Sequence, residues 1–454
     1  MAANPKRSLR RFTILTLGCK VNQYESESIA QALCNRGLMD VTPLLGKQEA
    51  QPDLCIVNTC CVTGKAAMQS RQTIRRMIRR HPQALILVTG CYAQTAPADI
   101  SAIPGVHGVI GHAEKHRLPE IVLNGANDKE LFRPGPVWKK PGPHPPFVEA
   151  SPPLNTRTRP FLKIQDGCDA FCTYCIVPYA RGPVRSMPFE TVRTHVACIA
   201  QAGFHEVVLT GIHLGRYGSD LTPTTGLASL LKTLINDKAI DRIRLSSIEP
   251  LEFTADLLQT ALTAAEPPGH VCRHFHVPLQ SGADRILQRM KRPYRRREFT
   301  DLVQRLHHAM PDAAIGADVL IGFPGETDQD FAETFTLIQS LPLAYLHVFP
   351  FSPRGGTAAA TLDGRVNPAV IRERCRRIRR LGREKRRLFL NRLVDRRVEI
   401  LVEQQRDTRT GQLKGMTSNY ATILTKGSDA LQNTLQTVRI TGLVDGRTLA
   451  GERL

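Results

Sequence analysis

Short, continuous apolar runs that alternate with helical segments are the feature that most constrains the fold of this chain. Near the N-terminus these runs are Phe12–Gly18, Asp53–Thr59, Ala84–Gly90 and Gly105–Gly111, and segments with a helical period, such as Glu25–Arg36, stand between them. Strands buried on both faces of a parallel sheet have this continuous apolar character, and the intervening helices cover the two faces. Residues 1–133 are therefore predicted to form a doubly wound parallel α/β domain.

A proline-rich stretch separates this domain from a second one. Residues 134–160 hold nine prolines, a composition typical of an extended linker between domains. The alternation then resumes, with strands predicted at 161–165, 206–212, 242–247, 274–279, 314–321 and 344–350. Six β/α units fall short of the eight of a closed barrel. Residues 161–392 are therefore predicted to form an open, partial (β/α)6 barrel.

The last part of the chain has a different pattern. A basic helix is predicted at Pro368–Leu393 from the spacing of its apolar residues. It is followed by short β-rich pieces such as VEILVE, NYATILT and TVRITGLV, with turn residues between them. This pattern predicts a small antiparallel β-barrel over residues 393–454.

The net charge and the absence of long apolar runs indicate which class of protein this is. The formal net charge is +20, and residues 372–397 alone carry 13 Arg or Lys against three acidic residues. Such runs can be solvated helix faces, but the overall excess favours a nucleic-acid partner. The chain has no run of 18 apolar residues and its basic N-terminus lacks the apolar core of a signal peptide, so we expect a cytoplasmic protein without a membrane partner. Cysteine clusters in the cytoplasm more often mark metal or catalytic sites than disulfides.

Three cysteines stand within eight residues of the segment DGCDAFCTYCIVPYARG, at Cys168, Cys172 and Cys175. A structural zinc site needs a fourth ligand, and the nearest histidine along the chain, His195, lies in a predicted helix. Iron–sulfur cubanes are normally held by four thiolates, so three would leave one iron open for a substrate or cofactor. The loop follows the first predicted barrel strand, at the end where such folds place their chemistry.

Three further cysteines follow the first three strands of the N-terminal domain. Cys19 ends TLGC, Cys60 ends VNTC and Cys91 ends VTGC. The carboxyl ends of neighbouring parallel strands meet at one edge, where open α/β sheets bind ligands. The pattern favours a second three-thiolate cluster at this edge.

The other cysteines of this domain are expected to play no part in that cluster. Cys34 lies in a predicted helix and Cys55 inside a strand, so both are predicted to be core residues. Cys61 neighbours Cys60 but is expected to point elsewhere.

The spacing of Cys168, Cys172 and Cys175, with Tyr174 before the last cysteine, resembles that of the radical S-adenosylmethionine (SAM) enzymes. The resemblance implies that these cysteines ligate a [4Fe-4S] cluster whose open iron chelates SAM. Reductive cleavage of SAM then gives a 5′-deoxyadenosyl radical. It also implies that Tyr174 lies near the adenine of SAM.

Together with the upstream cysteines, the whole chain resembles the methylthiotransferase family. The shared stretches are LGCKVNQYESE, NTCCVT, HVPLQSGADRILQRMKRPY, IGFPGET, FPFSPRGGT and, in the last 62 residues, KGMTSNYATI. The resemblance implies an N-terminal domain with a cluster held by Cys19, Cys60 and Cys91, a central radical SAM barrel, and a C-terminal TRAM domain that binds RNA.

The same resemblance implies the reaction. LGCKVNQYESE and GCDAFCTYCIVPYARG look most like the branch that adds a methylthio group to C2 of N6-threonylcarbamoyladenosine at position 37, in the anticodon loop of tRNA. The upstream cluster would carry the extra sulfur, and flavodoxin or ferredoxin would supply electrons. Alternatives are a methylthiotransferase for N6-isopentenyladenosine-37 or for a ribosomal protein, and a non-catalytic iron–sulfur protein that binds RNA.

Polar residues and glycines at the predicted strand ends are secondary candidates. They suit contacts to SAM but also ordinary turns, and they are Thr210, Gly211, Gln280, Ser281, Gly322 and Glu326. Arg181 and Arg354 are candidates for contact with the SAM carboxylate or an RNA phosphate.

Overall fold

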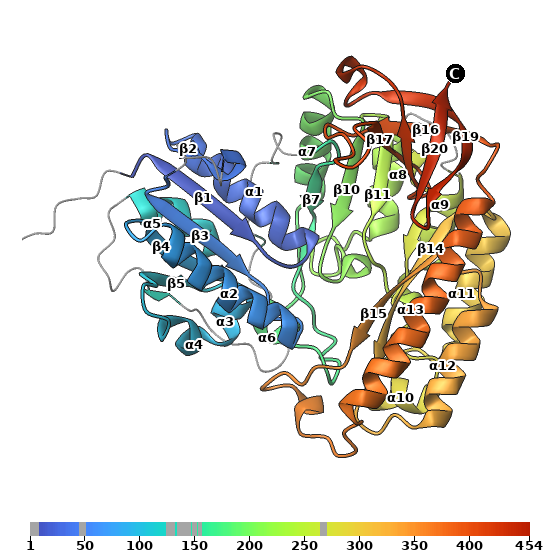
Figure 1. Ribbon diagram of the computed structural model, residues 1–454, viewed down its shortest axis with the longest axis horizontal. Coiled ribbons are helices and arrows are strands. Elements are labelled where there is room, and N and C mark those ends of the chain that lie inside the picture. The colour runs from blue at the N-terminus through green and yellow to red at the C-terminus, as the bar shows by residue number, and fades with distance from the viewer. Residues whose placement is uncertain are drawn as a thin grey trace, which may run out of the picture. The chain divides into compact units, whose positions relative to one another are not determined.

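The computed structural model describes residues 9–44, 51–123, 132–133, 147, 152, 157–263 and 270–454 (Figure 1). The chain forms two compact units. Unit 1 comprises Met1–Pro153, Asp166–Arg185 and Ser352–Thr357, and unit 2 comprises Leu154–Gln165, Ser186–Phe351 and Ala358–Leu454. The segment with three cysteines therefore packs with the N-terminal unit. The predicted linker 134–160 lies almost entirely outside the described residues.

Unit 1 is built on a parallel sheet of six strands in the order β2-β1-β3-β4-β5-β6. The strands are β1 (Arg11–Thr16), β2 (Met39–Asp40), β3 (Leu54–Thr59), β4 (Leu85–Gly90), β5 (Gly108–Ile110) and β6 (Phe132–Arg133). Every neighbouring pair is parallel. The predicted doubly wound α/β architecture is confirmed. The two-residue edge strands β2 and β6 are too short to have an apolar pattern of their own.

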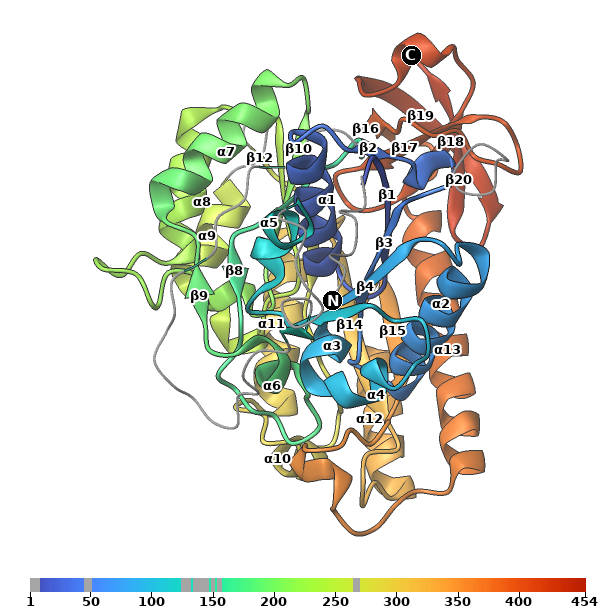
Figure 2. The ribbon, with the colours of Figure 1, turned by 90° about the vertical axis from the view of Figure 1, so that its left-hand side faces the viewer.

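Helices cover both faces of this sheet, as Figure 2 shows. One face packs against α1 (Lys20–Cys34) and α5 (Leu118–Leu123), through Ile29, Leu33 and Ile121. The other packs against α2 (Gly64–Arg80), α3 (Cys91–Thr95) and α4 (Pro97–Ser101). Helix α1 begins five residues before the predicted start because Val21 and Tyr24 already point into the core.

Unit 2 contains the parallel strands of the partial barrel. They form the sheets β12-β11-β10-β7 and β13-β14-β15, with β7 (Phe161–Lys163), β10 (Glu206–Thr210), β11 (Arg242–Leu245), β12 (His270–Val271), β13 (His274–His276), β14 (Ala314–Ile321) and β15 (Tyr345–Pro350). The amide of Ile248, just after β11, donates to the carbonyl of His276 at 3.0 Å and links the two sheets. The open (β/α)6 architecture is confirmed.

Helices follow the strands of unit 2 and cover their outer face. They are α7 (Phe189–Gln201), α8 (Leu227–Asp237), α9 (Ala255–Thr263), α10 (Asp284–Arg289), α11 (Arg296–Ala309), α12 (Asp328–Ser340) and α13 (Pro368–Asn391). Figure 1 shows α13 running alongside β15. Short elements at the base of the cysteine segment are β8 (Gln165–Asp166), α6 (Val177–Arg181) and β9 (Arg185–Ser186). None of the described helices combines the length and the apolar character needed to cross a membrane.

The C-terminal part of unit 2 is a closed five-stranded barrel in the order β16-β17-β18-β20-β19. Its strands are β16 (Arg397–Val402), β17 (Leu413–Thr417), β18 (Thr422–Thr425), β19 (Leu435–Asp445) and β20 (Thr448–Arg453). All pairs are antiparallel except β18 with β20, which is parallel. A ring with an odd number of strands cannot alternate direction throughout, so one parallel pair is required. The prediction of an antiparallel barrel holds apart from this pair.

Buried charges attach this barrel to the strands of the partial barrel. Arg244 on β11 donates to the carbonyl oxygens of Thr417 and Ser418 at 3.1 and 3.0 Å and pairs with Glu206 on β10. Arg242 donates to the carbonyl of Met416 and to the Glu399 side chain. Glu206, Arg242 and Arg244 are almost completely buried. The small barrel is thus a packed part of unit 2, as its place beside β10 and β11 in Figure 1 illustrates.

Candidate functional site

The upstream cysteines stand at the carboxyl edge of the unit 1 sheet. Cys19 follows β1 and is the N-cap residue of α1, Cys60 follows β3, and Cys91 begins α3 directly after β4. Strands β1, β3 and β4 are neighbours in the sheet. The three thiols therefore reach the same edge from adjacent strands.

Two glycines allow these turns to approach each other. Gly18 has φ +99°, and a Cβ at this position would lie 2.9 Å from Cys60 Sγ. Gly90 has φ +96°, and a Cβ there would lie 2.4 Å from the Thr59 carbonyl oxygen. Only glycine adopts such a conformation without strain and leaves this room. The glycines of TLGC and VTGC thus keep the turns of Cys19 and Cys91 close to Cys60.

The electrostatics of the upstream thiols suit a cationic metal centre. Burial, together with the nearby Cys91 and Cys19, raises the pKa of Cys60 to about 12. Burial also raises the pKa of Cys91, whereas Arg181 and Lys115 lower it. Three soft sulfur donors that repel one another as thiolates are stabilised when they share an iron–sulfur cluster. The residues present therefore fit a three-thiolate cluster.

The remaining cysteines of unit 1 differ in their surroundings. Cys55 is buried in β3, as predicted, and Cys61 is fully buried and accepts a hydrogen bond from the Thr95 hydroxyl. Cys34, predicted to be a core residue, is exposed. That prediction is wrong because Cys34 is the last residue of α1 and follows the buried Leu33 on another face of the helix.

The second cysteine segment forms a closed loop. The amide of Cys168 donates to the Gly182 carbonyl at 3.0 Å, and the amide of Cys175 donates to Cys172 at 2.9 Å. Gly167 has φ +73°, and a Cβ there would lie 1.8 Å from the Pro183 carbonyl oxygen, so the base of the loop admits only glycine. The amide of Ala170 points to Cys168 Sγ at 3.5 Å. Backbone donors to sulfur are a regular feature of iron–sulfur sites.

A buried guanidinium joins the two cysteine sites within unit 1. Arg181, at the end of α6, donates to Asp166 at 2.9 Å, to Glu25 at 3.1 Å and to the Asn22 side chain at 2.6 Å. Asp166 precedes the loop of Cys168, and Asn22 and Glu25 lie in the first turns of α1, which Cys19 caps. Although burial opposes it, the charges of Glu25, Asp166, Cys91 and Cys19 raise the pKa of Arg181.

Two further residues complete this buried network. Lys115 donates to Glu25 at 2.7 Å and to Asn58 at 3.3 Å. His112 Nε2 lies 3.1 Å from Asp166. Burial and the charge of Arg181 lower the pKa of His112 to about 4, so the ring is neutral at physiological pH. The sequence did not single out Glu25, Lys115 or His112, because only the fold brings them together.

Arg181 is therefore engaged inside the protein. It is 1% exposed and bonded to two carboxylates. The expectation that it meets the SAM carboxylate or an RNA phosphate is wrong, because a fully paired, buried guanidinium cannot leave its partners without leaving them charged and unpaired. Arg354 is half-buried, in the segment Ser352–Thr357, where Ser352 accepts a hydrogen bond from the Gly64 amide at 2.8 Å.

The secondary candidates occupy the strand ends of unit 2. Thr210 ends β10 and is buried, and a Cβ on the next residue, Gly211, would lie 2.8 Å from Gln165 Oε1. Gln280 has φ +62° and forms a β-bridge with Val319 of β14. Its neighbour Ser281 lies 3.3 Å from the hydroxyl of Thr334.

Glu326 and Gly322 form an internal turn after β14. Glu326 Oε2 accepts from the Gly322 amide at 3.0 Å, and Glu326 Oε1 accepts from Arg374 of α13 at 2.5 Å. Gly322 has φ +81°, and a Cβ there would lie 2.4 Å from Ile371. These contacts give both residues a role in packing α13. Tyr174 is half-buried in the cysteine loop of unit 1.

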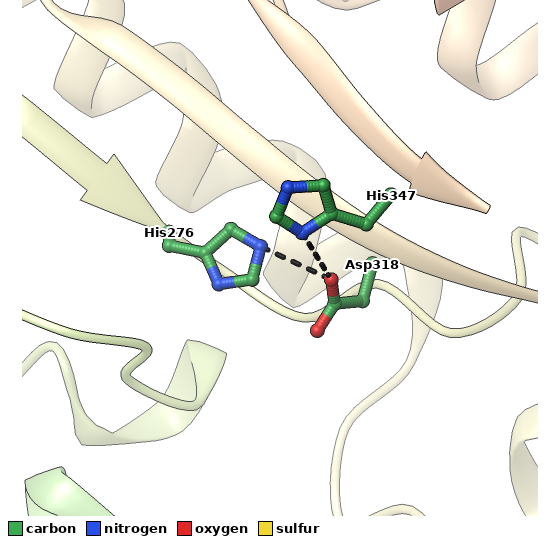
Figure 3. Close-up of side chains that lie close together, drawn as sticks. All are labelled: His276, Asp318 and His347. Carbon is green, nitrogen blue, oxygen red and sulfur yellow. Dashed lines mark hydrogen bonds and ion pairs between the residues drawn. The ribbon is translucent and has the colours of Figure 1, made fainter. Parts of the chain in front are cut away.

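A polar group that sequence reasoning missed lies in unit 2. The Oδ1 atom of Asp318 lies 3.1 Å from His276 Nε2 and 3.1 Å from His347 Nδ1 (Figure 3). Their strands β13, β14 and β15 are adjacent. The sequence carried a weak signal for two members of this group, since Asp318 and His347 interrupt otherwise apolar strands, whereas His276 lies in a short strand with a second histidine, His274.

Comparison with family models divides the chain in the same way. Residues 11–111 match the model described as "Uncharacterized protein family UPF0004", and residues 162–338 match the radical SAM superfamily. Among solved structures, the radical SAM methyltransferase TsrM from Kitasatospora setae, with cobalamin and a [4Fe-4S] cluster bound, is similar with a TM-score of 0.55. It is 15% identical and covers 78% of this chain and 77% of its own. This likeness shows the shared fold.

Similar proteins extend over almost the whole chain. The threonylcarbamoyladenosine tRNA methylthiotransferase MtaB of Bacillus subtilis is 36% identical and covers 94% of this chain and 92% of its own. The MtaB of Aquifex aeolicus is 35% identical over 91% of this chain and 96% of its own. The tRNA-2-methylthio-N(6)-dimethylallyladenosine synthase of Pelotomaculum thermopropionicum is 34% identical and covers 96% of both chains.

Identity of 34–36% over 91–96% of the chain is enough to show the family. The family uses two [4Fe-4S] clusters and SAM, which agrees with a chain that presents two separate sets of three cysteines. The chain belongs to the radical SAM methylthiotransferase family.

Proposed function

We propose that this protein transfers a methylthio group to C2 of N6-threonylcarbamoyladenosine at position 37 of tRNA. The observation that carries the proposal is the presence of two three-cysteine sites in unit 1, joined through the Arg181 network. C2–H of adenine has no acidic proton and no leaving group, so acid–base catalysis offers little there. A radical cofactor supplies the reactivity, and the protein positions the partners.

In this proposal Cys19, Cys60 and Cys91 hold the upstream [4Fe-4S] cluster, which provides the sulfur. Cys168, Cys172 and Cys175 hold the second cluster, which binds SAM through its open iron. When bound and reduced, that cluster supplies the electron that cleaves SAM to a 5′-deoxyadenosyl radical. The chain's own contribution is to keep each thiol set together, through Gly18 and Gly90 in one case and Gly167 in the other.

The substrate assignment rests on the similar proteins and on the motifs quoted above. Those from Bacillus subtilis and Aquifex aeolicus are named for threonylcarbamoyladenosine. The synthase acting on dimethylallyladenosine is only slightly less identical. That substrate, which is isopentenyladenosine, is therefore the main alternative.

We assign the tRNA-binding surface to the C-terminal barrel and α13. We infer that residues 1–133 bear the upstream cluster, residues 161–392 the SAM chemistry and residues 393–454 an RNA-binding TRAM domain. Helix α13 exposes seven arginines, which suits phosphate contacts. A small β-barrel can bind single-stranded bases of an anticodon loop. A protein acting on tRNA would work in the cytoplasm, with flavodoxin or ferredoxin as reductant.

One nucleoside measurement tests the substrate. Mass analysis of tRNA from a strain that lacks this protein should show loss of 2-methylthio-N6-threonylcarbamoyladenosine and retention of the unmethylthiolated nucleoside. Unchanged levels would exclude the assignment, and loss of the isopentenyl counterpart would establish the alternative.

A second experiment separates an enzyme from a non-catalytic RNA-binding protein. Anaerobically reconstituted protein with a strong reductant should release 5′-deoxyadenosine from SAM. Cys172→Ala should abolish this release, whereas Cys198→Ala, which changes a cysteine on α7 outside both sets, should retain it. Absence of 5′-deoxyadenosine from fully loaded protein would favour the non-catalytic alternative.

A further inference from the structure

The helix-free face of β13, β14 and β15 presents the group formed by His276, Asp318 and His347. Leu346 of β15 packs against Gly382 of α13. A Cβ atom added to Gly382 would lie 3.3 Å from the Leu346 side chain. Side chains alternate across a strand, so Tyr345, His347 and Phe349 point to the opposite face. Figure 3 shows His276 and Asp318 turned toward His347 on that face.

Hydrogen bonds fix how His347 is presented. Burial alone would raise the pKa of Asp318, but hydrogen bonds from His276 and His347 hold it well below its ordinary value. An ionised carboxylate can only accept, so His347 Nδ1 donates to it, and in the neutral ring Nε2 carries the lone pair. The orientation of the His276 ring is also fixed by a hydrogen bond, since its Nδ1 atom lies 2.5 Å from the Ser247 hydroxyl.

A row of rings leads along this face to His347. Tyr420 of the terminal barrel stacks on His274 at 4.2 Å, His274 stacks on Tyr345 at 5.8 Å, and Tyr345 lies 5.3 Å from His347. Gly316 makes room for the row, because a Cβ there would lie 2.0 Å from the ring of Tyr345.

The row is closed at one end and open at the other. His274 is buried, whereas the His347 side chain is 53% exposed and Phe349, 6.4 Å further along, is 40% exposed. Phe349 lies near the carboxyl end of β15 and His347 at the middle of this strand, and β/α folds bind ligands at the carboxyl ends of their parallel strands.

We propose that His347 and Phe349 bind the adenine that the enzyme modifies, with the base stacked on Phe349 and His347 Nε2 accepting a hydrogen bond from the N6–H group. Bases of single-stranded loops bind proteins by stacking on aromatic rings and by hydrogen bonds at their edges. A phosphate suits this group poorly, since Asp318 is negative and His347 presents a lone pair. The inference rests on the proposed function for the identity of the base.

Binding measurements with the whole reconstituted protein test both contacts. The probes are two anticodon stem–loop RNAs, one with N6-threonylcarbamoyladenosine at position 37 and one with unsubstituted purine, which lacks the N6 donor. Phe349→Ala should weaken binding of both RNAs by about fivefold to a hundredfold, the range for loss of one base stack. His347→Ala should weaken binding of the first RNA and leave that of the purine RNA unchanged.

Matched variants keep the test specific. Phe349→Tyr retains an aromatic face and should bind as the wild type does. Met39→Ala removes an exposed apolar side chain on β2, and His308→Ala removes an exposed histidine on α11. Neither should change the discrimination between the two RNAs, measured as the ratio of their dissociation constants.

Three outcomes would overturn or separate the proposals. A His347→Ala variant that keeps the wild-type discrimination, together with a Phe349→Ala variant that binds both RNAs as tightly as the wild type, would overturn this inference and leave the proposed function standing. A stoichiometric divalent metal beyond the cluster iron, lost in His276→Ala and in His347→Ala, would overturn it as well, because the metal would occupy the ring nitrogens. If the threonylcarbamoyl nucleoside is not the substrate, an RNA with unmodified adenosine still tests the N6–H contact, so the two failures are distinguishable.

Discussion

The guanidinium of Arg181 donates a hydrogen bond to Asp166 at 2.9 Å across the base of the loop that carries Cys168, Cys172 and Cys175. The same side chain reaches Glu25 on α1, the helix that begins directly after Cys19. A single buried cation therefore holds the backbone around one cysteine set to the helix that carries part of the other. This relationship gives the two cluster sites of unit 1 a common structural support.

Loss of this cation should destabilise unit 1 and impair loading of both clusters. Arg181→Met leaves Glu25 and Asp166 buried with one partner fewer, a change that typically costs about 3–5 kcal/mol of unfolding free energy. Urea unfolding of the iron-free protein and iron content after reconstitution measure the two effects. Arg193→Met, which removes an exposed surface pair, should cost much less unfolding free energy than Arg181→Met. Equal stability of the two variants would contradict a supporting role for Arg181.

The doublet Cys60-Cys61 allows a sharp test of the upstream ligand set. With two [4Fe-4S] clusters, reconstituted wild type should hold about eight irons per chain. Cys60→Ala should hold about four irons per chain, because the upstream cluster loses one of its three ligands, the thiol that packs against Gly18. Cys61→Ala should keep about eight, since Cys61 packs in the core and bonds to Thr95. The reverse result would show that the ligand assignment within the doublet is wrong.

The sequence predicted those parts of the molecule that depend on local pattern. Apolar runs placed β1, β3, β4 and β14 within about one or two residues of their observed bounds, because both faces of these strands are buried. The position of each upstream cysteine after its strand was visible for the same reason. The closing strand pair β18–β20 was missed, since strand direction in a barrel depends on the whole ring.

Contacts between distant parts of the chain were beyond local pattern. Glu25 and Arg181 are 156 residues apart, and the ion pair between them is set by the packing of α1 against the cysteine loop. The approach of His276, Asp318 and His347 depends on strand register and on the room at Gly316. The periodicity of the sequence therefore cannot predict contacts between residues so far apart in the chain.

The buried arginines of β11 should be essential for the stability of unit 2. Arg244→Met removes the nearest of the three arginines that pair with Glu206, and the donors to Thr417 and Ser418, and should cost about 3–5 kcal/mol. Arg439→Met, which removes an exposed pair with Asp395 on the terminal barrel, should cost less than about 1 kcal/mol. Urea denaturation measures both.

The same contacts predict the result of truncation. Deletion of residues 393–454 would remove Tyr420 and expose Arg242, Arg244 and His274, so the remaining protein should unfold more readily as well as bind tRNA less tightly. Unchanged stability of the truncated chain would show that the terminal barrel is an independent domain.

Exposed arginines of α13 should contribute to tRNA affinity through their attraction to phosphates. Arg380, Arg383 and Arg387 are exposed, whereas Arg374 pairs with Glu326 and Arg386 donates to the Tyr420 carbonyl. Removal of one arginine–phosphate pair lowers the slope of log affinity against log salt by about 0.7–0.9. Replacement of the three exposed arginines by glutamine should therefore reduce the slope in titrations between low and high salt, without change in thermal stability. An unchanged slope would show that these α13 arginines do not contact the tRNA phosphates.

Buried His270 should make the stability of unit 2 depend on pH. Burial and the nearby Arg242 lower the pKa of His270 to about 4, below the ordinary value of about 6.5. Between these values the unfolded chain binds a proton that the folded chain does not, so stability is complete above pH 6.5 and falls as the pH decreases toward 4. The contribution is on the order of 3 kcal/mol across this window.

Urea midpoints of iron-free protein at several pH values between 4 and 7.5 measure this dependence. In His270→Phe the midpoint should fall less steeply on acidification, because the substituted ring takes up no proton in the unfolded state. Some dependence should remain, since the pKa of His112 in unit 1 is also lowered to about 4. Further substitution of His112 should flatten the curve again. Parallel curves for wild type and His270→Phe would mean that His270 is protonated alike in the folded and unfolded states, and that its burial beside Arg242 carries no proton linkage.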